Sequence, residues 1–389
     1  MTREPAAIRV VGATDGNPWA QSTWSGSSAR LWSALERRDA LAGVVSVKPR
    51  WLDIAERAAS LSRDRTAWRQ RYRGAASPLS PLVRRAMTAV GSRRALRAGR
   101  GADAVLQISG WYDARRAMPP GTLLCTYQDA NVALWRGRPD LKLDPDDRGL
   151  RRTFEHERRA YASMDLVMTM SEWARRSFVE DFGLPPAKVV AVGAGANLDS
   201  LPVPPVRELS PPRVLFVGLK FDRKGGPDLL AAFGRLRAEQ PEAELWIVGP
   251  PPGPDVAGVR WLGPVYRRTP EGARELDRLF REATVFALPS IYEGFGMPFL
   301  EAMAYGLPCV GTDVCAIPEI VRDGDTGVIV PAQDRRALHA ALAALAADPA
   351  RAAALGARGR EAVVAHWTWD AVAERIAGAV AERLSGPAF

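Results

Sequence analysis

The sequence is poor in the residue types that most metal sites and nucleophilic catalytic arrangements use. Its 389 residues include three cysteines and three histidines. The cysteines, at positions 125, 309 and 315, have no metal-ligand spacing and form no disulfide framework, which favours a reducing cytoplasm. The histidines are too few to argue for a Ser-His-Asp or Cys-His arrangement. Hydrolases and zinc proteins of the familiar kinds are therefore disfavoured.

Long apolar runs and two common nucleotide-binding motifs are also missing. No stretch of about 18 apolar residues occurs, so we expect no transmembrane helix. The first residues lack the basic, apolar and small-residue order of a signal peptide, and we expect them to open the first strand. No G-x-G-x-x-G follows that strand, which argues against a nicotinamide cofactor, and no Walker A motif occurs.

Two acidic triplets are the remaining candidates for a metal site. They are Asp144 to Asp146 and Asp323 to Asp325, both in turn-like stretches with glycine or proline. So short a motif occurs often by chance. We therefore predict no metal site and no cofactor.

Short β-branched and apolar runs alternate with longer amphipathic stretches along the chain. The expected strands of the first half are 8–14, 44–49, 104–109, 122–129, 165–170 and 188–193. Those of the second half are 213–218, 244–249, 259–263, 284–289, 308–313 and 327–331. Strands that alternate with helices predict parallel sheets covered on both faces.

A proline-rich segment separates the two series of strands. Residues 198–213 contain five prolines, which neither a helix nor a central strand accepts. We therefore predict an α/β protein of two Rossmann-like domains, 1–198 and 213–369, joined by a linker over 199–212. The last helix, about 370–389, is expected to join the first domain. A ligand site in the cleft between the domains is then expected.

The stretch LPSIYEGFGMPFLEAMAYGLPCVGTD, residues 288–313, combines a strand end, a glycine-rich turn and a helix. A helix that opens at Met-Pro would offer free N–H groups to an anion, and Gly294 and Gly296 would let the backbone approach a ligand. Glu293 lies before the turn, and Glu301 lies about one and a half turns into the helix. A ligand with a diphosphate, a ribose and a sugar would use all these groups. The alternative is an ordinary corner with surface glutamates.

The motif EGFGMPFLE resembles the E-x7-E signature of GT-B glycosyltransferases, in particular the large retaining family GT4. Other segments resemble that family in the expected order, and the resemblance is weakest over 37–121. The matching segments are 17–36, 161–197, 214–233 and 301–334. The resemblance implies the GT-B fold and a retaining transfer of a sugar from a nucleotide-diphosphate sugar to an acceptor hydroxyl, without a metal.

The resemblance also implies roles for individual residues. Glu293 would contact and position the donor sugar, and Glu301 would bind the ribose hydroxyls. Lys224, with Arg223 or Lys220, would neutralise the diphosphate leaving group.

Glycines and backbone groups complete the implied donor site. Gly294 and the backbone of Phe295, Gly296 and Met297 would lie against the sugar and the distal phosphate. Gly26 would bring an N-terminal loop close to the phosphates and the acceptor.

One departure from the family concerns its N-terminal domain, where many relatives carry a histidine near the sugar. His156 and His366 lie in helical stretches, for which structural or surface roles are expected. The comparable strand end holds Gln128 and Asp129. Asp129 could orient the acceptor hydroxyl or cap the next helix, and both readings stay open.

Two alternative functions stay open beside the transferase. One is another GT-B activity, such as a phosphorylase or an epimerase. The other is a non-catalytic protein that binds nucleotide sugars. The donor base, the sugar, the acceptor and the oligomeric state cannot be read from these residues, and a nucleic-acid partner is not expected.

The charge of the chain gathers in one segment. Residues 51–100 hold twelve arginines against three acidic residues, and the chain's net charge is +9. The segment includes an apolar stripe of Leu79, Leu82, Val83, Met87 and Val90 between arginines. A solvated helical face would explain the pattern, but so would attachment to anionic lipid at the inner face of the cell membrane.

Attachment to membranes is open to a direct test. We expect the protein to co-sediment with vesicles that contain anionic lipid, and to be released by salt because the attraction is electrostatic. Neutral vesicles are the control. A protein that stays in the supernatant at low salt would remove the membrane hypothesis.

Overall fold

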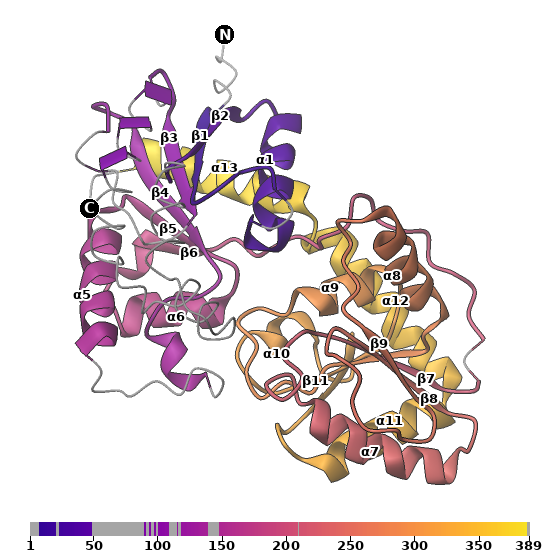
Figure 1. Ribbon diagram of the computed structural model, residues 1–389. Coiled ribbons are helices and arrows are strands. Elements are labelled where there is room, and N and C mark those ends of the chain that lie inside the picture. Colours follow the sequence, from indigo (N-terminus) through magenta and orange to yellow (C-terminus); the bar gives the residue numbers. More distant parts are fainter. Residues whose placement is uncertain are drawn as a thin grey trace, which may run out of the picture. The chain divides into compact units, whose positions relative to one another are not determined.

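The computed structural model describes residues 8–20, 23–48, 89–90, 93–94, 97–98, 100–108, 115, 118–138, 148–208 and 210–386. The chain divides into two compact units (Figure 1). The first unit comprises Met1–Arg136, Lys142–Gly193 and Val372–Phe389, and the second comprises Gly137–Leu141 and Ala194–Ala371. The proline-rich residues 199–212 are thus grouped with the second unit.

The first unit is built on a six-stranded parallel sheet with the order β2-β1-β3-β4-β5-β6. Its strands are β1 (Val10–Thr14), β2 (Leu41–Ser46), β3 (Ala104–Ile108), β4 (Leu123–Gln128), β5 (Leu166–Thr169) and β6 (Val189–Ala191). Its helices are α1 (Ser27–Arg37), α5 (Arg148–Ser163) and α6 (Glu172–Glu180), with short 3-10 turns η1 (Thr23–Gly26), η3 (Leu134–Gly137) and η4 (Pro186–Lys188). Strands β1, β3 and β5 are buried along their whole length, as apolar strands of a covered parallel sheet are.

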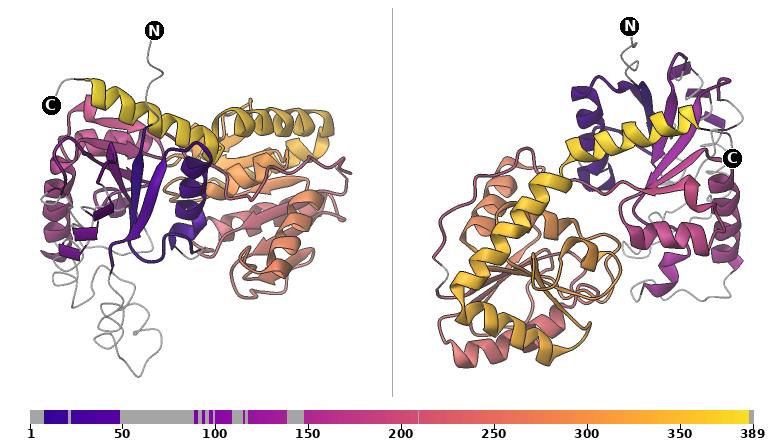
Figure 2. Two further views of the ribbon diagram at one scale, coloured as in Figure 1. Left: turned by 90° about the horizontal axis from the view of Figure 1, so that it is seen from above. Right: turned by 180° about the vertical axis from the view of Figure 1, so that it is seen from behind.

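The last helix returns the chain to the first unit. Helix α13 (Trp369–Ser385) lies beside this sheet (Figure 2). Arg375 Nε donates to the carbonyl of Val192 at 2.7 Å, and Arg383 Nε donates to that of Asp165 at 3.2 Å. Val372, Ile376 and Val380, four residues apart, are buried and form the apolar face of the helix.

The second unit has a six-stranded parallel sheet with the order β12-β11-β10-β7-β8-β9. Its strands are β7 (Arg213–Val217), β8 (Glu244–Val248), β9 (Val259–Gly263), β10 (Val285–Ala287), β11 (Cys309–Thr312) and β12 (Gly327–Val330). Its helices are α7 (Gly226–Glu239), α8 (Pro270–Glu282), α9 (Met297–Ala304), α10 (Ile317–Ile320), α11 (Arg335–Ala347) and α12 (Pro349–His366).

Helices cover both faces of the second sheet. Helix α7 packs with α11 on one face, and α9 packs with α12 on the other (Figure 1). Strands β7 and β10 are neighbours, with Phe286 opposite Leu215. Because the chain leaves β7 toward one face and β10 toward the other, the switch point of this sheet, where open parallel sheets bind ligands, lies at the ends of these two strands.

All twelve strands expected from the sequence are present, so the predicted fold class is confirmed, with shifts at some ends. The largest shift is in β2, which begins at Leu41 rather than 44 and ends at Ser46 rather than 49. Gly43 lies inside it, and glycine is depleted in strands, so the pattern did not reveal the true start. Among the described residues, no helix is both long and apolar enough to cross a membrane.

Candidate active site

The loops that follow β7 and β10 cross backbone against backbone at the switch point of the second sheet. The N–H of Ile291 donates to the carbonyl of Arg223 at 2.9 Å, and the Arg223 guanidinium donates to the carbonyl of Tyr292. Gly225 has a φ of +71°, and a Cβ there would lie 1.8 Å from the Pro289 carbonyl oxygen. A residue with a side chain would push the two loops apart.

This crossing brings Lys224 and Glu293 together. Lys224 Nζ lies 2.5 Å from Glu293 Oε2, and the two side chains are 10% and 13% exposed. A Cβ at Gly218 would lie 2.2 Å from Lys224 Cδ, so the lysine stem passes over the bare end of β7. Sequence reasoning missed Gly218, although a glycine directly after an apolar strand is a signal for close approach.

Helix α9 begins just beyond Glu293. Gly296 is its N-cap, with a φ of 109° and a ψ of 41°. The side chain of Phe295 is buried and makes an edge contact with Trp367 at 5.8 Å between ring centroids. Met297 and Pro298 open the helix, as the Met-Pro pair predicted. The amino end of α9 thus lies next to the Lys224–Glu293 pair.

Glu301 meets a cation that the sequence did not reveal. Arg267, from the loop between β9 and α8, places its Nη2 atom 3.4 Å from Glu301 Oε2. Both side chains are largely buried, at 19% and 15% exposure. The two positions are 34 residues apart, and an arginine in a polar loop gives no sequence signal of such a contact.

Other predicted site residues lie elsewhere. Lys220 is exposed, although its carbonyl accepts from the Lys224 N–H at 2.9 Å. Gly26 belongs to the first unit, where it is buried with a φ of 82° and precedes α1. Asp129 also belongs to the first unit and follows β4, which ends at Gln128.

The strand end at 128–131 is a polar cluster. Gln128 is buried and its Nε2 donates to Thr126 Oγ1 at 2.6 Å. The N–H of Leu134 in η3 is bound by Asn131 Oδ1 at 3.2 Å, so Asn131 takes the capping role considered for Asp129.

The histidines lie on helices, and the Asp323–Asp325 triplet lies in the loop before β12. His156 is on α5, His366 ends α12, and His339 on α11 lies 3.0 Å from Glu239. Asp323 Oδ1 accepts from the N–H of Ile329, and Asp325 pairs with Arg322 and Arg358. Asp144 and Asp146 lie outside the described residues. Within the described part of the chain, no group of three His, Cys, Asp or Glu side chains could hold a metal ion.

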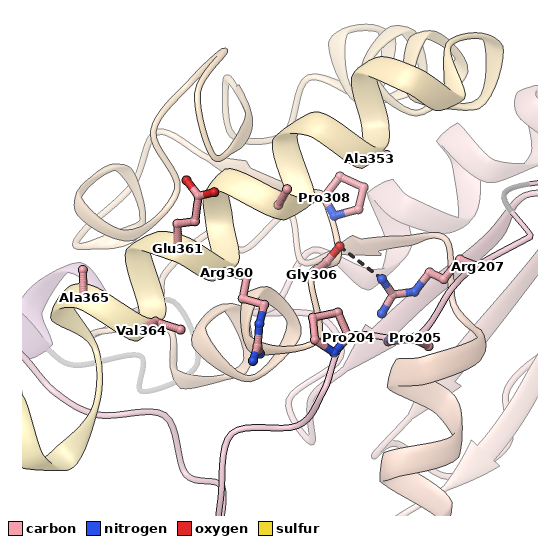
Figure 3. A pocket seen from close by; sticks show the side chains of 11 residues that line it. Pro204, Pro205, Arg207, Gly306, Pro308, Ala353, Arg360, Glu361, Val364 and Ala365 are labelled. Carbon is pink, nitrogen blue, oxygen red and sulfur yellow. Dashed lines mark hydrogen bonds between the residues drawn. The ribbon is translucent and has the colours of Figure 1, made fainter.

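A pocket of about 600 Å³ lies in the second unit, away from this site (Figure 3). It is lined by Pro308 at the start of β11, by Gly306 and by α12. Arg207 in its wall donates to the carbonyls of Phe280, Arg281, Tyr305 and Gly306. The pocket therefore lies at the amino end of a strand, whereas ligands of open parallel sheets bind at the carboxyl ends.

The pKa of Cys315 reflects the burial and the charges around Glu293. Burial raises the pKa of its thiol to about 11. A hydrogen bond to the Glu293 main chain and the charge of Arg223 lower this pKa, while the Glu293 carboxylate raises it. The resulting balance keeps Cys315 a neutral thiol near pH 7.

Comparison with known proteins places this site in a family. A sequence model described as "Glycosyl transferases group 1" matches residues 211–348, which contain the whole Lys224, Glu293 and Glu301 arrangement. The match covers the sheet and the candidate site of the second unit, not the whole chain. The chain's solved neighbours include a sucrose-phosphate synthase from Thermosynechococcus elongatus, with a TM-score of 0.68, 19% identity and coverage of 97% of this chain and 99% of that one. The likeness shows the GT-B fold.

Curated relatives of the family match part of the chain. The alpha-maltose-1-phosphate synthase of Mycolicibacterium smegmatis is 35% identical over 43% of this chain and 47% of its own length. The GDP-mannose-dependent alpha-(1-6)-phosphatidylinositol monomannoside mannosyltransferase of the same organism is 33% identical over 59% of this chain and 64% of its own length. The chain thus covers less than two thirds of either relative.

The ion pair between Lys224 and Glu293 should make the effects of substitutions at the two positions on stability non-additive. Lys224→Met leaves a nearly buried carboxylate without its partner and should cost about 3 kcal/mol, and Glu293→Gln should also destabilise. The double variant should melt closer to the wild type than Lys224→Met does, because no charge is then stranded. Thermal unfolding midpoints check this order.

A surface pair supplies the control for this experiment. Arg278 and Glu282 lie 2.6 Å apart with side chains nearly half exposed, and Glu282→Gln should change stability by less than about 1 kcal/mol. Additive losses in the Lys224 and Glu293 variants would contradict a coupled pair.

Alkylation of Cys315 should follow its raised pKa. Because the thiolate is the nucleophile, iodoacetamide should modify Cys315 slowly at pH 8, about tenfold faster for each pH unit up to about 11. Glu293→Gln removes a charge that raises this pKa and should speed the reaction at pH 9. Peptide mass spectrometry measures it, with Cys315→Ser as the control. Alkylation at pH 8 as fast as that of a free thiol would contradict the burial.

Proposed function

We propose that the protein is a retaining glycosyltransferase of the GT4 type that moves a sugar from a nucleotide-diphosphate sugar to an acceptor hydroxyl. The observation that carries the proposal is the Lys224–Glu293 ion pair at the switch point of the second sheet, beside the amino end of α9. A cation and an anion meet there with free backbone N–H groups, which suits a ligand with both a diphosphate and hydroxyls.

In this proposal the cations act on the leaving group. Lys224 and Arg223 neutralise the charge that grows on the diphosphate as its bond to the anomeric carbon breaks. Arg223 is better placed for this than Lys220, because its guanidinium is fixed at the loop crossing by the Tyr292 carbonyl. Such a clamp does the electrostatic work without a metal, and we propose no cofactor beside the donor.

The carboxylates bind the uncharged parts of the donor. Glu293 contacts the sugar hydroxyls and positions the sugar, while its pair with Lys224 keeps the carboxylate oriented. Gly294, Phe295, Gly296 and Met297 present their backbone to the sugar and the distal phosphate. The buried ring of Phe295 anchors this turn.

In the same proposal, Glu301 accepts hydrogen bonds from the ribose hydroxyls. A carboxylate accepts two hydrogen bonds from a cis-diol with good geometry. Its place in the second turn of α9, behind the glycine turn, suits a ribose that follows the phosphates.

The acceptor is assigned to the first unit. Gly26 and the Gln128–Asp129 strand end lie near the carboxyl ends of the strands there, and Asp129 would orient the acceptor hydroxyl. One relative is named for a phosphatidylinositol monomannoside, which supports a sugar or lipid-linked acceptor. We place the reaction in the cytoplasm, at the membrane surface where the basic segment 51–100 meets anionic lipid. Most of that segment lies outside the described residues.

Donor binding tests the proposal. We expect one of UDP, GDP, ADP, CMP or dTDP, or its common sugars, to raise the melting temperature, and GDP-mannose is the first to try because a relative is named for it. Glu301→Ala should weaken binding about tenfold or more, because a charged acceptor of hydrogen bonds is lost. Thermal shift followed by calorimetry measures both.

The control removes a carboxylate that lies on the surface. Glu271 on α8 is 77% exposed, and Glu271→Ala should leave donor binding unchanged. No shift with any nucleotide would contradict the transferase. Binding without acceptor-dependent release of nucleotide would favour the non-catalytic alternative, and turnover with phosphate or without an acceptor would favour a phosphorylase or an epimerase.

A further inference from the structure

Arg267 reaches a face of α9 on which two functional groups lie one turn apart. Glu301 is in the second turn of the helix, and Tyr305 is its C-cap, four residues later. Positions four apart lie on the same side of a helix. The Arg267 guanidinium lies 3.4 Å from Glu301, and its charge lowers the pKa of the nearby Tyr305 hydroxyl. One cation therefore lies close to both groups.

A second carboxylate, Asp277, feels the charge of Arg267 and binds its neighbour Tyr305. The Tyr305 hydroxyl donates to Asp277 Oδ1 at 2.8 Å, and Asp277 Oδ2 lies 2.7 Å from Arg281 Nε. Tyr305 is buried, and its ring stacks on Phe280 at 5.2 Å between centroids. Burial and the Asp277 hydrogen bond raise the pKa of Tyr305 to about 12, so this hydroxyl stays protonated at neutral pH. The network therefore keeps a fixed geometry behind Arg267.

We propose that Arg267 is a positioning residue that holds the Glu301 carboxylate in the orientation needed to accept the hydroxyls of a ribose, so that the protein selects ribonucleotides over deoxyribonucleotides. The inference rests on the proposed donor site. A carboxylate whose rotation is restricted by a guanidinium loses less entropy when it binds a diol. Arg267 acts through Glu301, beside the hydrogen bond that joins Tyr305 to Asp277.

Arg268 provides a matched neighbour in the same loop. Its guanidinium packs over the ring of Tyr266, 4.3 Å from the ring centroid. Arg268→Ala therefore removes the same charge from the same loop, one residue away, without touching the Glu301 contact.

The experiment measures binding of UDP and GDP together with their 2′-deoxy counterparts by calorimetry. The wild type should bind the ribonucleotide about tenfold more tightly or better, as expected for hydrogen bonds to a charged group. Arg267→Ala should reduce this ratio to about twofold while the deoxynucleotide affinity changes little. Arg268→Ala should keep the wild-type ratio, and Arg267→Lys should restore part of it, because it returns the charge without the fork.

A double variant separates positioning from a general loss of fold. Glu301→Ala should abolish the preference, and Arg267→Ala added to it should change nothing further. If Arg267→Ala does not fold, the ratio in Arg267→Lys and Arg267→Gln decides. A wild-type preference that survives in the Arg267 variants, or one that Arg268→Ala removes equally, would overturn the inference and leave the donor site standing. A wild type that binds none of these nucleotides would overturn the proposed function itself.

Discussion

The close approach of two backbones at Gly225 and Pro289 is the constraint on which the site depends. A side chain at 225 would collide with the Pro289 carbonyl, so the loops after β7 and β10 meet only with glycine there. Their meeting places Lys224 within 2.5 Å of Glu293, although 69 residues separate them in the chain. It also fixes Arg223 on the Tyr292 carbonyl. Chain topology places the two loops side by side, and the missing Cβ of Gly225 lets them touch.

Charge pairing then determines which groups can lie at this switch point. The Glu293 and Glu301 side chains are largely buried, and each lies against its own cation, Lys224 or Arg267. Burying an unpaired charge is costly, so the cations make these positions possible for carboxylates. The pairing places two carboxylates a short way from a helix amino end, where an anion is also favoured. A ligand with negative and hydroxyl groups at different positions is the natural counterpart.

The sequence predicted the elements well because their signals are local. Alternating apolar strands and amphipathic helices revealed all twelve strands, and the Met-Pro pair and Gly306 marked α9. Glu293, Glu301 and Lys224 were named through a motif. Their partners were not, because Arg267 and Gly218 act through tertiary contacts that no spacing encodes. The start of β2 at Leu41 is not evident from the sequence, because Gly43 weakens the strand pattern. The sequence offered Asp129 as a cap of the next helix, whereas Asn131 provides that hydrogen bond.

The ion pair of Arg267 and Glu301 borders a larger set of contacts that extends to α8 and to the proline-rich segment. Arg267 lies close to the Tyr305 hydroxyl, which donates to Asp277, and Asp277 pairs with Arg281 at the carboxyl end of α8. The Tyr305 carbonyl is in turn bound by Arg207 from the proline-rich segment. Because Tyr305 and Asp277 are each bound from two sides, the Arg267–Glu301 pair lies beside an ordered network rather than beside solvent. A network satisfied at every member specifies one geometry, whereas the loss of one member strands a charge in a poorly solvated region. The proline-rich segment thereby becomes part of the support of the candidate active site.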